Sequence, residues 1–92
     1  MRILVTPSFE RIAKRLHKQQ KVVLDEAVRS IAANPAIGEE KIGDLAGIRV
    51  YKFILSDQLI LLAYRFLNPD TIKLLTLGPH ENFYRDLKRL KP

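Results

Sequence analysis

Apolar residues recur in the first part of the chain at the spacing of a helix. A β-branched stretch at residues 2–6 (RILVT) predicts a strand, and Thr6–Pro7 then predicts a helix start. Threonine is a favoured N-cap, and proline loses no hydrogen bond at the first helical position. The stripe that follows has the i, i+3, i+4, i+7 spacing of one helix face. It consists of Phe9, Ile12, Ala13 and Leu16.

A second apolar stripe predicts a helix over about residues 20–33. Its members are Leu24, Ala27, Val28 and Ile31. Asn34–Pro35 ends this helix, because the residue before a proline disfavours the helical conformation. Two short antiparallel helices are therefore expected after the first strand.

The period of the pattern changes after the second helix. Residues 36–47 contain three glycines and no regular period, which predicts a loop. β-Branched, aromatic and leucine residues then dominate three segments that predict strands. These segments are residues 48–55, 58–67 and 71–77. The middle segment is apolar on both faces, as expected of a strand that is covered. The short separators Ser56–Asp57 and Asn68–Pro69–Asp70 are typical of tight turns, so an antiparallel meander is expected.

The last periodic segment predicts a short amphipathic helix, with Phe83, Leu87 and Leu90 on one face. No repeat or linker is visible, so a single domain over residues 1–92 is expected. The order β-α-α-β-β-β-(α) predicts an α+β fold, an antiparallel meander sheet packed by an N-terminal helical hairpin. The other face of the sheet is expected to stay partly open and to carry a site.

Charge narrows the classes of partner. The chain carries 16 Lys+Arg against 10 Asp+Glu, a net charge of +6, which favours nucleic acid, an anionic surface or an acidic protein. It has no cysteine, which excludes a disulfide framework and a thiolate metal site. The apolar runs are too short for a signal-peptide core or a membrane span, so no membrane association is expected. The absence of cysteine suits the cytoplasm, which is the expected location.

His80 is the first candidate for chemistry. It follows Gly78–Pro79 at the end of a predicted strand, a position where functional side chains often lie. Histidine can donate and accept a proton near neutral pH. In a helix, Tyr84 lies on the same face at i+4, so the two side chains can flank a scissile phosphate. The alternative is an ordinary solvated histidine at a helix start.

Basic residues interrupt the predicted strands and form the second candidate group. They are Arg49, Lys52, Arg65 and Lys73. A charge within a strand must reach water or find a partner. An exposed cationic face or edge of the sheet is therefore expected, able to bind phosphate and to stabilise a pentacoordinate transition state. For Lys73 the alternative is protection of an edge strand.

Further basic and aromatic side chains have a functional and an ordinary interpretation. The C-terminal basic residues either follow an RNA backbone or form a solvated helix end. They are Arg85, Lys88, Arg89 and Lys91. Lys41, in the long loop, is able to swing toward a substrate. The strand aromatics either stack on bases or pack in the core. They are Tyr51, Phe53, Tyr64 and Phe66. No metal cluster or phosphate-cradling glycine loop is present, so no metal or cofactor is expected.

Three segments resemble the RelE/ParE superfamily of bacterial toxins from type II toxin–antitoxin modules. They are GDLAG with RVYKF (residues 43–53), LLAYRF (61–66) and LGPHENFYRDLK (77–88). With the order of elements, the resemblance covers nearly the whole chain. It implies a small basic ribonuclease that cuts mRNA in the ribosomal A site, where the 2′-hydroxyl attacks the adjacent phosphate without a metal. The implied partners are a cognate antitoxin in a hetero-oligomer, the ribosome and mRNA.

The resemblance also assigns residues. His80 and Tyr84 occupy the place of a catalytic histidine and an aromatic residue four positions later, and Arg65 and Lys52 match basic catalytic residues on the sheet. The residues implied to bind RNA are Lys41, Arg49, Lys73, Arg85 and Lys88.

One departure and two alternatives remain open. Histidine-rich members carry more histidines and an acid around the first meander hairpin, whereas this chain has Lys52 and Asp57 there. Either Lys52 or Lys41 therefore contributes to proton transfer and charge stabilisation together with His80, or catalysis is weak. ParE-like members inhibit DNA gyrase without cleaving RNA, and typically lack the His/Tyr pair. An inactive relic that binds only RNA or antitoxin is the third reading.

Overall fold

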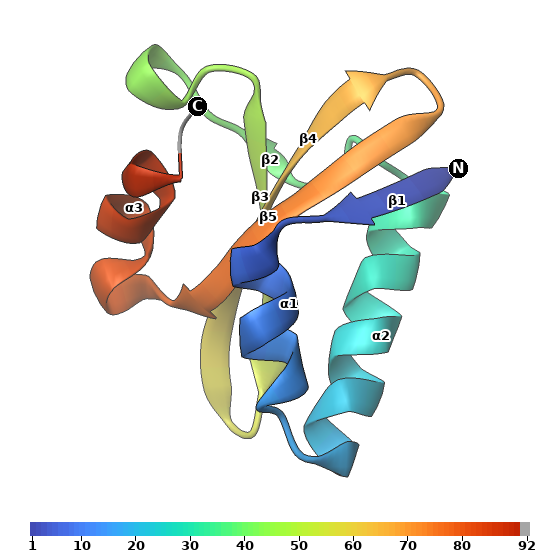
Figure 1. Ribbon diagram of the computed structural model, residues 1–92, viewed down its shortest axis with the longest axis vertical. Helices are drawn as coiled ribbons and strands as arrows, with labels where there is room; N and C mark the ends of the chain where they lie inside the picture. Colours follow the sequence, from blue (N-terminus) through green and yellow to red (C-terminus); the bar gives the residue numbers. More distant parts are fainter. Residues whose placement is uncertain (91–92) are drawn as a thin grey trace.

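The computed structural model describes residues 1–90, and its elements follow the expected order (Figure 1). The strands are β1 (Arg2–Val5), β2 (Glu39–Glu40), β3 (Ile48–Leu55), β4 (Gln58–Asn68) and β5 (Thr71–Pro79). The helices are α1 (Pro7–Lys14), α2 (Lys18–Ala33), the 3₁₀ turn η1 (Gly43–Leu45) and α3 (His80–Arg89). The α+β class, the helical hairpin and the C-terminal helix are confirmed, and α2 begins at Lys18, two residues before its expected start.

The five strands form one sheet in the order β1-β5-β4-β3-β2. The predicted meander of β3, β4 and β5 is antiparallel, as expected. β1 joins it in parallel beside β5, from Arg2 opposite Thr71 to Val5 opposite Leu74. The strand at the start of the chain thus lies beside the last strand.

The prediction of a loop over residues 36–47 is wrong in two places. Glu39–Glu40 forms β2, which pairs with Val50 and Arg49 of β3, and Gly43–Leu45 forms η1. Two consecutive glutamates have low strand propensity. These residues form a strand because they pair with the edge of β3, and the local sequence pattern does not predict that pairing.

Local signals explain where α1 begins and where the hairpin turns. The Phe9 N–H donates to Thr6 Oγ1 at 3.0 Å, which is the expected N-cap. The same hydroxyl donates to the Leu75 carbonyl at 2.5 Å and ties the helix start to β5. Ser56 and Asp57 have φ of 51° and 65°, the left-handed conformation that a two-residue hairpin between β3 and β4 requires.

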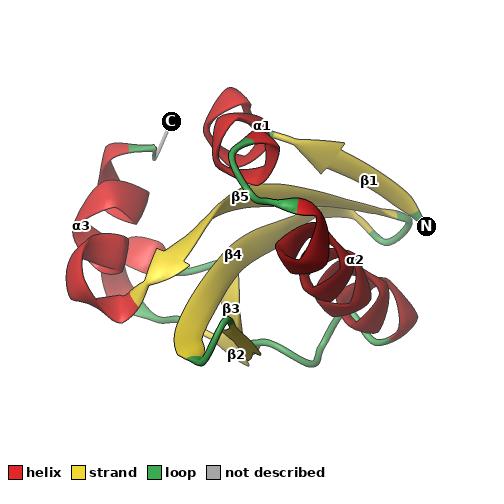
Figure 2. Ribbon diagram, turned by 90° about the horizontal axis from the view of Figure 1, so that it is seen from below, coloured by secondary structure: helices red, strands yellow, loops and turns green. Residues whose placement is uncertain are grey.

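Two apolar clusters sandwich the sheet. On one face, Phe9 of α1 and Ile31 of α2 pack against alternate residues of β4, including Tyr64. On the other, Phe83 and Leu87 of α3 pack against the residues in between. α1 and α2 cover the same face of the sheet, and Figures 1 and 2 show α3 apart from both of them. β4 is therefore covered on both faces, as its pattern predicted, while the α3 face also carries basic side chains.

No helix within residues 1–90 is long and apolar enough to cross a membrane.

Candidate functional site

α3 presents His80 and Tyr84 together. β5 runs to Pro79 and α3 begins at His80, while Phe83 and Leu87 anchor the helix to the sheet. His80 is exposed and Tyr84 is half-buried. Their ring centres lie 5.6 Å apart with the planes at 77°, an edge-to-face contact. The expectation that the two side chains share one face of a helix is confirmed.

Lys41 reaches the same place from the end of β2. Its Nζ lies 5.3 Å from the centre of the Tyr84 ring, a cation–π contact. Nζ also donates a hydrogen bond to the carboxylate of Glu39, and only 20% of the Lys41 side chain is exposed. The contact joins the loop region around residue 41 to α3, so Lys41, Tyr84 and His80 form one continuous group.

Glu39 and Lys41 shift each other's proton affinity. The hydrogen bond from Lys41 to Glu39 raises the pKa of Lys41, the Tyr84 hydroxyl raises it further, and burial opposes both. The same hydrogen bond and the charge of Lys41 lower the pKa of Glu39, and Lys52 contributes in the same direction. Lys41 is therefore an ammonium ion at neutral pH, suited to stabilising negative charge and unsuited to acting as a base.

Lys52 lies on the same face of the sheet. It is opposite Leu61 on β4, and Leu61 is opposite Gly78 on β5, two residues before His80. Opposed residues in a sheet point to the same side. The exposed Lys52 thus projects from the face that carries the site, and its effect on Glu39 agrees with this placement.

Glu39 is the site residue that the sequence reasoning did not assign. The signal was the spacing Glu39-x-Lys41, because residues i and i+2 of a strand point to the same face. That signal has meaning only if residues 39–40 form a strand, and the sequence predicted a loop.

A buried tyrosine holds the segment that delivers Lys41. Tyr64 is fully buried, and its hydroxyl accepts from the Gly38 N–H at 2.9 Å and donates to the Pro35 carbonyl at 2.7 Å. A Cβ at Gly38 would lie 2.7 Å from that hydroxyl, so the close approach requires glycine. Arg49 adds a bond from Nη1 to the Gly38 carbonyl at 2.7 Å. These bonds position β2 and, through it, Lys41.

Tyr64→Phe is expected to destabilise the protein by about 1–3 kcal/mol, because it leaves the Gly38 N–H and Pro35 carbonyl without their partner. Urea denaturation measures the loss. The pKa of Lys41, followed by NMR, should fall toward its ordinary value as β2 loosens. Tyr51→Phe removes the hydroxyl of a half-buried ring and serves as the control. Equal stability of the two variants would contradict the positioning role.

The expectation that the four strand cations share one surface is wrong for Arg49. Arg49 is opposite Tyr64, so it points to the α1–α2 face, and Lys52 points to the other. Its guanidinium donates to the carbonyls of Ala36 and Gly38 and pairs with Glu40 at 3.2 Å. Arg49 is engaged in holding the chain before β2.

Arg65 and Lys73 lie on the α3 face but are not brought to His80. They are opposite each other near one end of β4 and β5, whereas Pro79 is opposite Ile60 at the other end. At ~3.3 Å per residue, Arg65 is roughly 17 Å along the strand from Ile60. β1 pairs with β5 at Lys73, so the alternative that this lysine protects an edge strand is wrong.

Arg85 and Lys88 are exposed on α3. Lys88 follows Tyr84 by one helical turn, which places it on the side of α3 that carries the site. Arg85 Nε lies 3.7 Å from a carboxylate oxygen of its neighbour Asp86.

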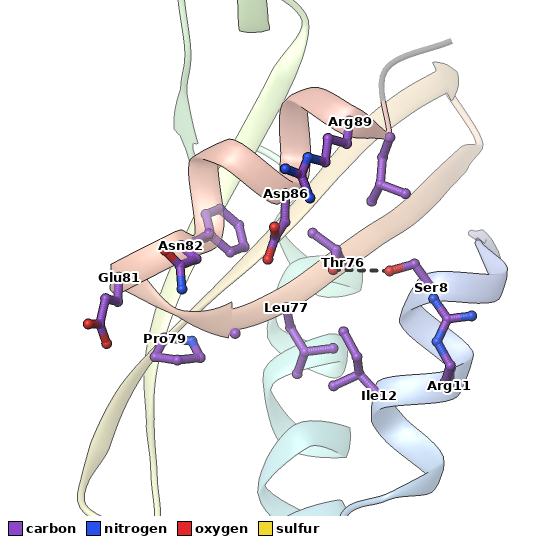
Figure 3. Close-up of a pocket in the computed structure, with 13 residues that line it drawn as sticks. Ser8, Arg11, Ile12, Thr76, Leu77, Pro79, Glu81, Asn82, Asp86 and Arg89 are labelled. Carbon is purple, nitrogen blue, oxygen red and sulfur yellow. Dashed lines mark hydrogen bonds between the residues drawn. The ribbon is translucent and has the colours of Figure 1, made fainter.

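A cavity of about 470 Å³ between α1 and α3 is separate from this group (Figure 3). Arg11 from α1 and Asp86 and Arg89 from α3 line it, and Ser8 and Thr76 meet there with their hydroxyl oxygens 3.4 Å apart. Of the candidate basic and catalytic residues named from the sequence, Arg89 lines it, and Lys91 lies outside the described residues. Its charges are of both signs, so it offers no focused positive field.

The residues described, 1–90, include no cluster of three or more histidine, aspartate or glutamate side chains arranged to hold a metal ion.

Fold and site together define a small basic α+β domain with an exposed histidine and fixed positive charge at one end of its sheet. The chain belongs to the family of ParE-like toxins of type II bacterial toxin–antitoxin systems, whose family model matches residues 3–88. It is therefore a toxin of such a module. No curated protein sequence matches it as a relative.

Solved structures with the same fold include E. coli RelE toxins. An E. coli RelE double mutant in the free state superposes with a TM-score of 0.71 at 14% identity, covering 98% of this chain and 97% of that one. The intact E. coli RelBE toxin–antitoxin complex gives 0.67 at 15% identity, over 87% and 96% of the two chains. Isolated E. coli RelE gives 0.65 at 15% identity, over 98% of each. At these identities the likeness establishes the RelE-like fold alone.

Proposed function

We propose that this toxin is a ribosome-dependent mRNA endoribonuclease. One observation supports this most directly: the Lys41 ammonium lies over the Tyr84 ring, and that ring contacts His80 edge-on. A group able to exchange protons and a fixed positive charge thus contact the same ring, and the histidine is exposed. The net charge of +6 favours RNA as the substrate.

The proposed reaction uses the RNA's own nucleophile. The 2′-oxygen forms a bond to the adjacent phosphorus, the bond from phosphorus to the 5′-oxygen breaks, and the products are a 2′,3′-cyclic phosphate and a 5′-hydroxyl. His80 takes the proton from the 2′-hydroxyl or gives one to the leaving 5′-oxygen. Lys41 and Lys52 stabilise the charge that develops on the phosphate oxygens. Tyr84 stacks on a base or orients the phosphate. Arg65 lies outside this proposed centre.

Activity is expected to require the translating ribosome. The site is a shallow exposed surface, and positioning supplies much of the rate in such reactions. Purified protein should leave naked mRNA largely intact and should cut the same mRNA during translation, as primer extension on both samples would report. Rapid, sequence-selective cleavage of protein-free RNA would contradict this dependence.

The ParE-like description of the matching family favours a second candidate, inhibition of DNA gyrase without RNA cleavage. Two assays on the same preparation separate the candidates. Cleaved mRNA in a translating extract supports the first, and inhibited supercoiling by purified gyrase supports the second. Neither effect would support the inactive relic.

We also propose a cognate antitoxin as partner, in a cytoplasmic toxin–antitoxin hetero-oligomer, by analogy with the E. coli RelBE complex. A surface of charge +6 favours an acidic partner, and charge complementarity speeds association. The toxin expressed alone should stop growth, and binding of the antitoxin should weaken as salt rises. Normal growth at good soluble expression of the free chain would contradict this proposal.

A further inference from the structure

A second groove lies on the α3 face, at the end of β4 and β5 away from His80. Its volume is about 450 Å³, and it is bounded by the η1 region, the end of α3 and the two strands. Arg65 and Lys73 line it together with leucines 67, 75, 87 and 90. Below it is called the Arg65–Lys73 groove.

The cations of this groove form no ion pair with Asp44, the one carboxylate that lines it, within the described part of the chain. Arg65 Nε is buried and has no hydrogen-bond partner among residues 1–90. Arg65 and Lys73 are opposed across β4 and β5, and like charges in that position repel. Neither of them forms an ion pair within the described part of the chain. A buried donor left unpaired destabilises the fold, so a bound anion would relieve a cost that is already present.

The walls of the groove indicate which anion fits. Leu67 and Leu90, which line the groove, are 47% and 37% exposed. Leu4 of β1 lies outside the lining, but it is opposite Lys73 and 39% exposed. A sugar–phosphate backbone gains little from such apolar walls, whereas an acidic side chain between apolar side chains satisfies both the cations and the leucines.

We propose that the Arg65–Lys73 groove binds a glutamate or aspartate flanked by apolar residues in a segment of the antitoxin. The identity of the partner rests on the function proposed above, whereas the chemistry of the groove does not. The groove lies apart from His80, so this contact would hold the partner without using the proposed reaction centre.

Peptide titration of the full chain tests the groove directly. The probes are a blocked pentapeptide with one glutamate between leucines, its glutamine counterpart and an RNA tetranucleotide. The NMR signal of the Arg65 Nε–H reports contact. We expect the glutamate peptide to shift this signal and to bind at least about tenfold more tightly than the glutamine peptide, the difference made by a charged hydrogen bond.

Arg65→Gln and Lys73→Gln should each weaken binding of the glutamate peptide by about tenfold. Lys21→Gln, which removes the same charge from the exposed surface of α2, should leave binding unchanged. If Arg65→Gln does not fold, Lys73→Gln and the two peptides on the natural chain still decide the question. Equal binding of both peptides would overturn the proposal. So would an Arg65 Nε–H signal that shifts with the RNA and with neither peptide. The assay uses no toxicity or cleavage, so failure of the proposed activity is recognised separately.

Discussion

Replacement of His80 by alanine is expected to slow mRNA cleavage on translating ribosomes by about 10²–10⁴-fold, the usual contribution of a general acid or base. The side chain is exposed and packs only edge-on against Tyr84, so its removal should leave the fold intact. Single-round cleavage on stalled ribosomes gives the rate, and circular dichroism confirms the fold.

The other histidine provides the matched control. His17 is exposed at the junction of α1 and α2, and His17→Ala should cleave at the natural rate. Tyr84→Phe separates the two roles of the tyrosine, because it keeps the ring and removes the hydroxyl. A loss comparable to that of His80→Ala assigns the hydroxyl to proton transfer or phosphate orientation, and a small loss assigns the ring to stacking. A folded His80→Ala protein with full activity would leave His80 as an ordinary helix-start residue.

Lys41→Ala should slow cleavage by about 10²-fold or more, because it removes a preorganised charge from the position where negative charge develops. The effect should appear in the rate of the chemical step, since the hydrogen bond to Glu39 and the contact with Tyr84 hold the ammonium in place before substrate arrives. Rates at saturating ribosome concentration measure this step directly.

Two further variants make the Lys41 test specific. Lys21→Ala removes an exposed lysine of α2 and should have no effect on the rate. Glu39→Gln removes the carboxylate whose hydrogen bond raises the pKa of Lys41, yet lysine remains charged at neutral pH without that help, so cleavage should change little. If Lys41→Ala cleaves at the natural rate, Lys52 alone stabilises the negative charge that develops on the phosphate.

Much of the fold could be predicted from the sequence because the signals that start and end its elements are local. The Thr6–Pro7 start of α1, the Asn34–Pro35 end of α2 and the left-handed Ser56–Asp57 turn depend on the conformations of adjacent residues. The apolar period of each segment reports burial on one face or two, which identified β4 as covered on both sides. Reading His80 and Tyr84 as neighbours required only the helical spacing of four residues.

Pairing between distant segments could not be read in this way. β1 beside β5 and β2 beside β3 join strands whose own residues carry no mark of the partner. Because the segment around residue 41 was predicted as a loop, the sequence did not assign Glu39 to the site. The four strand cations were also assigned to one surface. Alternation along β3 separates Arg49 from Lys52, and the register between β4 and β5 opposes Arg65 to Lys73 at the end of the sheet away from His80.

The sequence by itself determined the elements other than β2 and η1, the basic character and the candidate histidine, because each depends on residue type and short-range spacing. Only the tertiary structure decided which cation contacts the Tyr84 ring that packs against that histidine. Lys41 reaches Tyr84 because a hydrogen bond between Tyr64 and Gly38 holds the chain just before β2. These two residues are 26 positions apart in the sequence, yet the Gly38 amide nitrogen lies 2.9 Å from the Tyr64 hydroxyl oxygen. Contacts over that separation come from the packing of the whole sheet, and no local pattern encodes them.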